Sequence, residues 1–246
     1  MTERDLSDPA QVARMAADAE LRRAADDFVR LGCLQRYPYN FTWLGMPVIQ
    51  FPQDLVALQE IIWRVRPELI IETGVAHGGG TIFLASVLDL IGGAGSVVAI
   101  DVDIRAHNRQ AIEAHPLARR VTLIEGSSTH SSVVGRVAAL AEGKRVMAVF
   151  DSDHTHAHVL AELRAYAPMV RTGSYIAVLD TIVERMSPSE IGDRPWGPGN
   201  SPMTAVQEFL RHDHRFEIDT ALENTLLVSV APGGYLRCVA DPAPRS

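Results

Sequence analysis

Between residues 54 and 181, short apolar segments alternate with segments whose apolar residues have helical spacing. The short segments are continuously apolar instead of alternating with polar residues, and they occupy 69–74, 96–103, 121–127, 146–153 and 174–181. Strands that are apolar on both sides belong to a parallel sheet covered by helices on both faces. Right-handed crossovers between such strands produce a doubly wound sheet. The pattern therefore predicts an α/β fold with a mostly parallel, Rossmann-like sheet.

After residue 182 the alternation stops. The stretch VERMSPSEIGDRPWGPGNSPM is rich in Pro, Gly and Ser and is longer than an ordinary connector, which indicates a functional loop. A helix is predicted over 204–213, and two strand-like segments follow at 216–222 and 225–239, the second with a Pro-Gly-Gly turn. We expect these two segments to add antiparallel edge strands to the sheet.

The N-terminal part has a different pattern. Residues 8–31 place apolar residues at helical spacing among charges, which predicts one amphipathic helix that packs on the domain or meets a partner subunit in a homo-oligomer. The following stretch, 35–53, is rich in aromatic residues and proline, and is either a loop pinned to the core or a lid over a ligand pocket. We therefore divide the chain into an N-terminal helix and aromatic arm at 1–50 and a ligand-binding domain at 51–246.

Charge and apolar content exclude several classes of partner. The formal net charge is −7 and there is no cluster of Lys and Arg, so we expect no nucleic-acid partner. No run of about 18 apolar residues occurs, so no membrane span is expected. The first residues are charged and lack the apolar segment of a secretory signal, and Cys33 and Cys238 are two isolated thiols. These features predict a cytoplasmic protein.

A glycine-rich turn joins the first predicted strand of this series to a helix in the segment IIETGVAHGGGT. Glycine lets the backbone turn sharply and lets a ligand approach main-chain N–H groups at the helix N-terminus. The dinucleotide pattern G-x-G-x-x-G fails at Ala76, and the phosphate-binding pattern fails because no Lys follows Gly80. A purely structural turn is the alternative. The candidate ligand-binding residues here are Glu72, Gly74, Gly78 and Gly79.

Polar residues also end the next two strands. Asp101 lies about twenty residues beyond the glycines, where a carboxylate can accept both hydroxyls of a ribose. A helix-capping role is the alternative for Asp101, although Asp103 is equally placed for it. Ser127 and Ser128 follow the next strand and can border a ligand or cap a helix. Because parallel strands end at one edge of the sheet, we expect these residues to line one crevice.

Two carboxylates and a histidine form a further set. Asp151 ends the fourth strand and Asp180 the fifth, so both are predicted to point into the same crevice. Two carboxylates held close together require a cation between them or a proton on one of them, and oxygen ligands suit Mg²⁺. His154, predicted to begin the next helix, is a candidate general base. His156 and His158 favour helix-capping roles, and a zinc site built from the three histidines is the weaker alternative.

These residues together resemble a known family. The acidic-x-Gly-x-x-x-Gly-Gly turn resembles motif I of class I methyltransferases. The order of that turn, Asp101, 125–128, D-x-x-H at 151–154 and Asp180 is similar to the cephalosporin hydroxylase family, which includes rhamnosyl and other sugar O-methyltransferases. The resemblance covers about 51–234, and DRPWGPGNSPMTAVQEFL is its most specific part. It implies S-adenosylmethionine as methyl donor, contacted by Glu72, Gly74, Gly78, Gly79, Asp101, Ser127, Ser128 and Asp151.

For the acceptor side, the resemblance implies a divalent cation, Mg²⁺ or a similar ion, bound by Asp151 and Asp180, with His154 as the base. Relatives often end the fifth strand with Glu-Asp, as in the cephamycin-pathway protein, or with Asp-Asn, as in catechol O-methyltransferase. Here the strand ends with Leu179, Asp180 and Thr181, so one expected ligand is apolar or is the weaker threonine hydroxyl. Asp153 can replace it if its loop turns inward.

The expected activity is methylation of a hydroxyl oxygen on a sugar or related polyol, which makes the partner a small molecule or a glycan. The loop at 183–203 is the candidate acceptor lid, through Arg194, Trp196 and Asn200, although Trp196 is equally explained as an anchor of that loop. Two other functions stay open. A nicotinamide-dependent oxidoreductase fits the fold class, and a non-catalytic binding protein on a methyltransferase fold fits Leu179.

Overall fold

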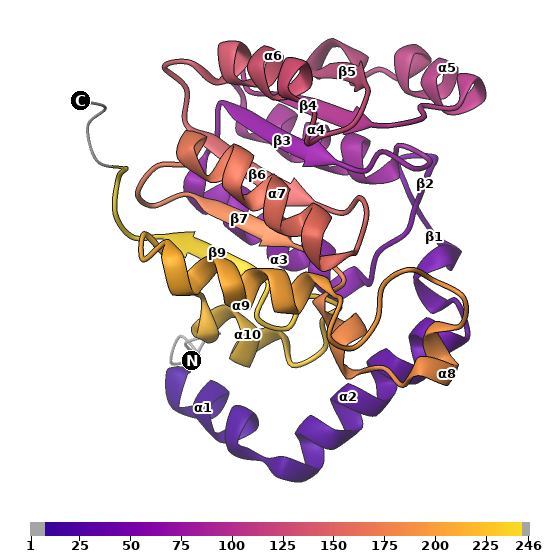
Figure 1. The fold of residues 1–246 in the computed structure, drawn as a ribbon, viewed down its shortest axis with the longest axis vertical. Coiled ribbons are helices and arrows are strands. Elements are labelled where there is room, and N and C mark those ends of the chain that lie inside the picture. Colours follow the sequence, from indigo (N-terminus) through magenta and orange to yellow (C-terminus); the bar gives the residue numbers. More distant parts are fainter. Residues whose placement is uncertain (1–7, 243–246) are drawn as a thin grey trace, which may run out of the picture.

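The computed structural model describes residues 8–242, and its centre is a seven-stranded sheet of order β5-β4-β3-β6-β7-β9-β8 (Figure 1). The strands are β3 (Leu69–Thr73), β4 (Ser96–Asp101), β5 (Val121–Glu125), β6 (Val146–Phe150), β7 (Tyr175–Val178), β8 (Phe216–Ile218) and β9 (Tyr235–Cys238). β3 to β7 pair in parallel, whereas β9 pairs antiparallel with both β7 and β8. The predicted fold class, including its antiparallel C-terminal edge, is confirmed.

Helices cover both faces of the sheet, with α6, α7 and α9 in front of it and α3 and α4 behind it in the view of Figure 1. They are α3 (Pro52–Val65), α4 (Gly79–Ile91), α5 (Ala106–Ala114), α6 (Ser131–Ala141), α7 (His156–Tyr166) and α9 (Pro202–His212). Successive residues of β3 enter different cores, since Ile70 packs with the α3 and α4 layer and Ile71 with the α6 and α7 layer. This two-sided burial explains why consecutive residues in the middle of the strand are apolar instead of alternating with polar residues.

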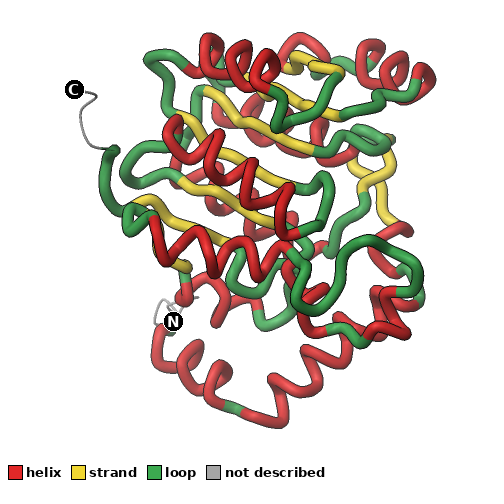
Figure 2. Tube along the Cα trace, viewed as in Figure 1, coloured by secondary structure: helices red, strands yellow, loops and turns green. Residues whose placement is uncertain are grey.

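The amphipathic segment near the N-terminus forms two helices, α1 (Pro9–Ala17) and α2 (Ala19–Leu34), drawn in Figure 2 as two helical tubes at an angle. The prediction of one helix over 8–31 is wrong at Asp18. This residue is extended, with φ −74° and ψ 106°, and its carboxylate accepts hydrogen bonds from the backbone N–H groups of Glu20 and Leu21. Asp18 thus caps α2 and interrupts the helix. Residues 1–7 of the predicted arm lie outside the described residues.

The aromatic stretch contains a short 3₁₀ helix, η1 (Tyr37–Asn40), and a hairpin of β1 (Phe41–Trp43) and β2 (Met46–Val48), which the sequence reading missed. The hairpin packs on α4. The Trp43 indole N–H donates to Ser86 Oγ at 2.9 Å, and its ring meets Phe83 edge-on at 4.9 Å. A Cβ atom at Gly79 would lie 2.1 Å from the carbonyl oxygen of Pro47, so this glycine allows β2 to approach the helix.

The C-terminal part departs from the prediction in one respect. The segment after β8 is a helix, α10 (Thr220–Leu226), and the last strand begins only at Tyr235. Asp219 starts α10 by accepting a hydrogen bond from the backbone N–H of Leu222 at 3.1 Å. The predicted long loop at 183–203 also contains ordered turns, namely η4 (Thr181–Arg185) and α8 (Pro188–Ile191).

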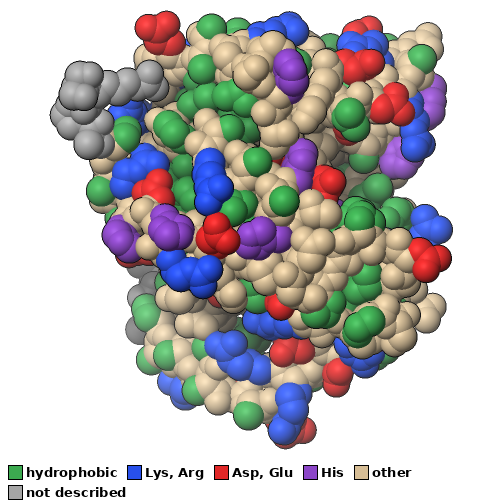
Figure 3. All heavy atoms as spheres, viewed as in Figure 1, with side chains coloured by type: hydrophobic (Ala, Val, Ile, Leu, Met, Phe, Trp, Pro, Cys, Tyr) green, Lys and Arg blue, Asp and Glu red, His purple; other side chains and the backbone are tan. Residues whose placement is uncertain are grey.

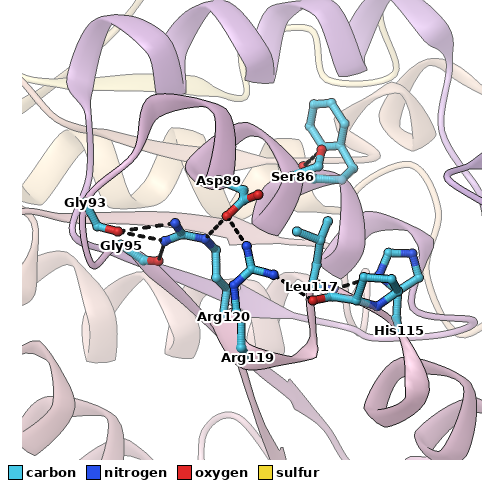
Figure 4. Close-up of polar contacts among 10 residues, drawn as sticks. Ser86, Asp89, Gly93, Gly95, His115, Leu117, Arg119 and Arg120 are labelled. Carbon is cyan, nitrogen blue, oxygen red and sulfur yellow. Dashed lines mark hydrogen bonds and ion pairs between the residues drawn. The ribbon is translucent and has the colours of Figure 1, made fainter.

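Asp89, Arg119 and Arg120 form a polar brace that holds the amino ends of β4 and β5 (Figure 4). These ends lie opposite to the carboxyl ends of the strands. Asp89, near the end of α4, accepts hydrogen bonds from Arg119 and from Arg120, the latter at 2.8 Å. Arg120 also donates to the carbonyl oxygens of Gly93 and Gly95. The brace fixes the turns that lead into β4 and β5.

Asp54 of α3 is a buried carboxylate with an exposed fraction of 0%. It accepts hydrogen bonds from Ser229 Oγ at 2.6 Å, from the backbone N–H of Val230 at 3.0 Å and from Tyr235 Oη at 2.8 Å. Burial is the main cause that raises the pKa of Asp54 to about 6. This group ties α3 to the segment that leads into β9.

The surface view in Figure 3 shows basic and acidic side chains interspersed on the face that it presents. Within residues 8–242, none of the helices has both the length and the apolar character that crossing a membrane requires.

Candidate active site

The candidate site lies at the carboxyl ends of β3, β4, β6 and β7, where the strand order reverses between β3 and β6. At such a switch point the loops from neighbouring strands diverge and leave a crevice. Gly74 follows β3 with a φ of 91°, and a Cβ atom there would lie 2.0 Å from the carbonyl oxygen of Asp151. Glycine is therefore required for the two strand ends to approach each other.

A first pocket of about 460 Å³, which we call the donor pocket, opens at the ends of β3, β4, β5 and β6. Its volume is within the range of small-molecule sites. Five predicted residues line it, namely Gly74, Asp101, Ser127, Ser128 and Asp151. The structure thus brings together residues from four strand ends that are far apart in sequence.

Asp101 stabilises the glycine-rich turn from within the donor pocket. Its Oδ2 accepts hydrogen bonds from the backbone N–H groups of Val75 at 2.8 Å and Ala76 at 3.3 Å. Ala76 has a φ of 44°, an uncommon conformation for a residue with a Cβ, so these bonds offset backbone strain. The capping alternative is not observed, because Arg105 occupies the N-cap of α5.

Beneath the donor pocket lies a buried polar network that the sequence reading missed. Glu162 Oε1 accepts hydrogen bonds from Ser128 Oγ at 2.5 Å and Ser152 Oγ at 2.8 Å. It also lies 3.2 Å from His158 Nε2, and this contact raises the pKa of His158. His158 is therefore an ion-pair partner and not a helix cap. The available signal was the i, i+4 spacing of His158 and Glu162 on one helix.

The other predicted glycines have packing roles. Gly78 has a φ of 85°, and a Cβ atom there would lie 2.5 Å from Ile112. The helix α5 therefore covers Gly78, and Gly78 lines neither the donor pocket nor the small cavity beside it. Gly79 and Glu72 line a small cavity of about 50 Å³ beside the donor pocket. The Thr81 hydroxyl donates a hydrogen bond to the Glu72 carboxylate, and burial raises the pKa of Glu72 to about 8.

This raised pKa of Glu72 predicts a pH-dependent stability. The folded protein retains a proton that the unfolded chain releases above a pKa of 4.5, so folding stability falls as pH rises from about 4.5 to about 8. The slope attributable to Glu72 is at most about 1.4 kcal/mol per pH unit. We expect the melting temperature of Glu72→Gln to exceed that of the unmodified protein by a margin that grows between pH 5 and pH 8. The exposed Glu60→Gln is the control, and equal margins at both pH values would contradict the prediction.

Three side chains meet next to the donor pocket, namely Asp151, His154 and Asp180, and one ligand atom of each lies within 4.8 Å of the other two. His154 Nε2 is 3.2 Å from Asp180 Oδ2. Burial, then Asp180, then Glu72 hold the pKa of the Asp151 carboxyl well above its usual range. A pair of partly buried carboxylates with an imidazole matches the ligand set of a hard divalent cation, which would relieve the repulsion between the carboxylates.

Three expectations about this cluster need correction. Thr181 is not placed as a ligand, because its hydroxyl is buried and donates to the carbonyl oxygen of Pro232 at 2.7 Å. His154 does not begin α7, which starts at His156, and it lies in the preceding loop beside Asp180. Asp153 does not supply the missing ligand, since its carboxylate accepts a hydrogen bond from the backbone N–H of Thr155 at 2.8 Å. Asp180 has a φ of 54°, an uncommon conformation that turns it into the cluster.

A second pocket of about 460 Å³, which we call the acceptor pocket, lies on the other side of this cluster. The sequence predicted Arg194 and Trp196 as part of it, and both line it. The Trp196 ring also lines the donor pocket and meets the His154 ring edge-on at 4.9 Å. The stretch 35–53, for which a lid over a ligand pocket was one of the two expectations, also lines it, through Arg36, Pro38, Tyr39, Ile49 and Gln50. Nothing in the sequence indicated Cys33 and Leu34, which α2 contributes.

Asn200 lies apart from both pockets. Its Nδ2 donates to the carbonyl oxygen of Pro195 at 2.8 Å, and its Oδ1 accepts a hydrogen bond from the backbone N–H of His156 at 3.0 Å. His156 in turn contacts Thr204 Oγ1 at 2.8 Å. The structure thus gives Asn200 a role in holding the loop against α7 and α9, and does not place it where an acceptor would bind.

Comparison with known proteins yields one consistent family. A family model described as "Rhamnosyl O-methyltransferase/CmcI" matches residues 35–239. The rhamnosyl O-methyltransferase of Mycobacterium tuberculosis is 30% identical over 206 residues, covering 79% of this chain and 77% of its own length. That of Mycobacterium leprae is 29% identical over 203 residues, covering 79% and 82%. Among solved structures, one described as "cmcI-D160 Mg-SAM" is 20% identical, with a TM-score of 0.56 over 82% of this chain and 78% of that chain.

The structural likeness at this level of identity supports the fold, whereas the family match extends over most of the sequence. It includes the glycine-rich turn, the metal-ligating candidates and the loop with Trp196. A nicotinamide-dependent oxidoreductase is therefore no longer a competing interpretation. The chain is an S-adenosylmethionine-dependent O-methyltransferase and belongs to the rhamnosyl O-methyltransferase/CmcI family.

Proposed function

We propose that this enzyme methylates a hydroxyl of a sugar or related polyol and requires a divalent cation such as Mg²⁺. The observation that carries the proposal is the position of Asp151, His154 and Asp180 between two pockets of similar volume. One pocket has room for the methyl donor, and the other for a second molecule whose hydroxyl would meet it. The names of the curated relatives, rhamnosyl O-methyltransferases, support a sugar acceptor.

On the donor side, the Asp101 carboxylate would accept hydrogen bonds from the ribose hydroxyls, because it lies in the pocket wall with lone pairs beyond those used by the turn. Ser127 and Ser128 would flank the adenine. Glu72 and Gly79 would lie near the amino acid portion, since they line the small cavity beside Gly74. Gly78 would act indirectly, by allowing the turn to pack on α5.

On the acceptor side, Asp151 and Asp180 would hold the cation, and His154 would accept the proton of the acceptor hydroxyl at Nε2. When bound, the cation supplies positive charge that lowers the pKa of that hydroxyl. The deprotonated oxygen forms a bond to the methyl carbon while the carbon–sulfur bond breaks and its electron pair stays on sulfur. His154 then releases its proton to solvent. Most of the rate is expected from the alignment of oxygen, carbon and sulfur.

The acceptor itself would be enclosed by two segments. Arg194 and Trp196 form one wall, where the indole offers an apolar surface for a sugar ring. We propose that the N-terminal unit at 1–50 forms the other wall as an arm over the domain at 51–246, because Tyr39 and Arg36 line the same pocket.

Calorimetric titration with S-adenosylhomocysteine, with and without Mg²⁺, tests this proposal. We expect micromolar binding, about −8 kcal/mol, for the unmodified protein. Asp101→Ala is expected to weaken binding at least tenfold in both conditions, because two hydroxyl contacts are lost. Asp180→Asn should bind the ligand normally but lose any dependence on Mg²⁺.

Two results would contradict the proposal. If the unmodified protein failed to bind S-adenosylhomocysteine in either condition, the assignment of the donor pocket would be wrong. Identical turnover of the unmodified enzyme in excess chelator and in Mg²⁺ would contradict the role of the cation. The remaining mechanism would be a metal-free transfer with His154 as base.

A further inference from the structure

Gln50 lies between β2 and α3, is 7% exposed, and lines both the acceptor pocket and the small cavity beside the donor pocket. Its Nε2 donates a hydrogen bond to Asp151 Oδ2 at 2.9 Å. Its Oε1 is buried and accepts no hydrogen bond from any residue in the part of the chain that the structure describes. The amide thus uses its donor on the candidate catalytic cluster and leaves its acceptor free inside the site.

A buried carbonyl oxygen without a partner destabilises the fold, and native proteins satisfy nearly all such groups. Polar atoms that stay unpaired in a site are therefore candidates for a ligand contact. The ligand must donate a hydrogen bond, because the free atom is an amide oxygen.

The residues that line the small cavity restrict the charge and size of this ligand further. Gln50, Glu72 and Asp151 all line the small cavity, and no Lys or Arg is among its lining residues. Two carboxyl groups and an amide oxygen around about 50 Å³ favour a compact, positively charged hydrogen-bond donor. The α-ammonium group of an amino acid has this size and charge, and the methyl donor ends in one.

The position of Gln50 is fixed by the N-terminal arm. The next residue, Phe51, is fully buried, and its ring meets the Phe28 ring edge-on at 6.1 Å and the Tyr37 ring at a tilt at 5.2 Å. It also shares a hydrophobic cluster with Ile182, which follows Asp180 by two residues. The arm therefore packs against Phe51, directly after Gln50, and this cluster also includes Ile182 near Asp180.

We propose that Gln50 is a donor-binding residue, which receives the α-ammonium group of the methyl donor at Oε1 while its side-chain N–H holds Asp151 in place. This assignment rests on the proposed function, because it takes S-adenosylmethionine as the donor. It makes the N-terminal arm part of the donor site as well as of the acceptor pocket.

A comparison of two ligands tests this role. S-adenosylhomocysteine has the amino acid portion, whereas 5′-methylthioadenosine has the same nucleoside without it. We expect Gln50→Leu to weaken S-adenosylhomocysteine binding about tenfold or more and to leave 5′-methylthioadenosine binding within about twofold, since only the first ligand has an ammonium group. The exposed Gln35→Leu is the matched control and should change neither affinity.

Gln50→Glu separates the two contacts of this side chain. It keeps an acceptor oxygen and removes the N–H that faces Asp151, so the preference for S-adenosylhomocysteine over 5′-methylthioadenosine should persist. Equal weakening of both ligands in Gln50→Leu, or no change in either, would overturn the assignment. Absence of binding by the unmodified protein would instead defeat the proposed function, and the titration of that protein alone distinguishes the two failures.

Discussion

Replacing Asp151 by asparagine is expected to lower methyl transfer about a thousandfold and, at the same time, to raise the melting temperature of the ligand-free protein. The loss follows because Asp151 would bind the cation, and losing such charge stabilisation costs several kcal/mol, with each 1.4 kcal/mol worth tenfold. The melting temperature should rise because burial, then Asp180, then Glu72 raise the pKa of Asp151 and so penalise its ionised form. Asparagine carries no charge and avoids this penalty.

Both effects of Asp151→Asn are measurable on one preparation. Formation of S-adenosylhomocysteine with a rhamnoside that has neighbouring hydroxyls reports turnover, and differential scanning fluorimetry at pH 8 reports stability. Each kcal/mol regained should raise the melting temperature by about 2–4 °C. The control is Asp103→Asn, at an exposed position two residues after the end of β4. Retained activity, or a lower melting temperature, would contradict this account of Asp151.

Asp54→Ala is expected to destabilise the fold by about 3–5 kcal/mol, which is about 10 °C or more in melting temperature. The substitution leaves Ser229, Tyr235 and the backbone N–H of Val230 buried without their acceptor. Each unsatisfied group costs about 1–3 kcal/mol, and part of the sum is recovered where water enters.

Asp54→Asn provides the comparison. It keeps one acceptor oxygen and removes the burial penalty of the charge, so its cost should be less than half that of Asp54→Ala. Urea unfolding followed by circular dichroism measures both variants. If Asp54→Ala lost less than 1 kcal/mol, the three hydrogen bonds would not be what joins α3 to β9.

The central fold was predictable from local sequence, because every strand from β3 to β7 is apolar on both sides and every intervening helix has its own apolar stripe. The N-terminal break was not, because Asp18 sits within a continuous helical spacing and only its side-chain bonds to Glu20 and Leu21 end one helix and start the next. The helix α10 was missed for the same reason, since capping by Asp219 outweighs the strand-like composition of that segment.

The candidate site was predictable as far as it depends on strand ends. Asp101, Asp151 and Asp180 end parallel strands, so topology alone brings them to one edge of the sheet. Residues that reach the site from elsewhere gave no such signal. Gln50, for example, approaches Asp151 across a sequence distance of 101 residues. The prediction of Asn200 as an acceptor residue was not supported, because its side chain bonds within its own loop and to α7.

Helix α2 ends at Leu34, and the family model begins to match at residue 35. This helix nevertheless supplies Cys33 and Leu34 to the acceptor pocket, and its Arg30 forms an ion pair of 2.6 Å with Glu190 of α8. Under the proposed function, a segment that precedes the family match therefore forms part of the surroundings of the acceptor. Substitutions on that helix would then change acceptor specificity without altering the residues proposed to bind the methyl donor and the cation.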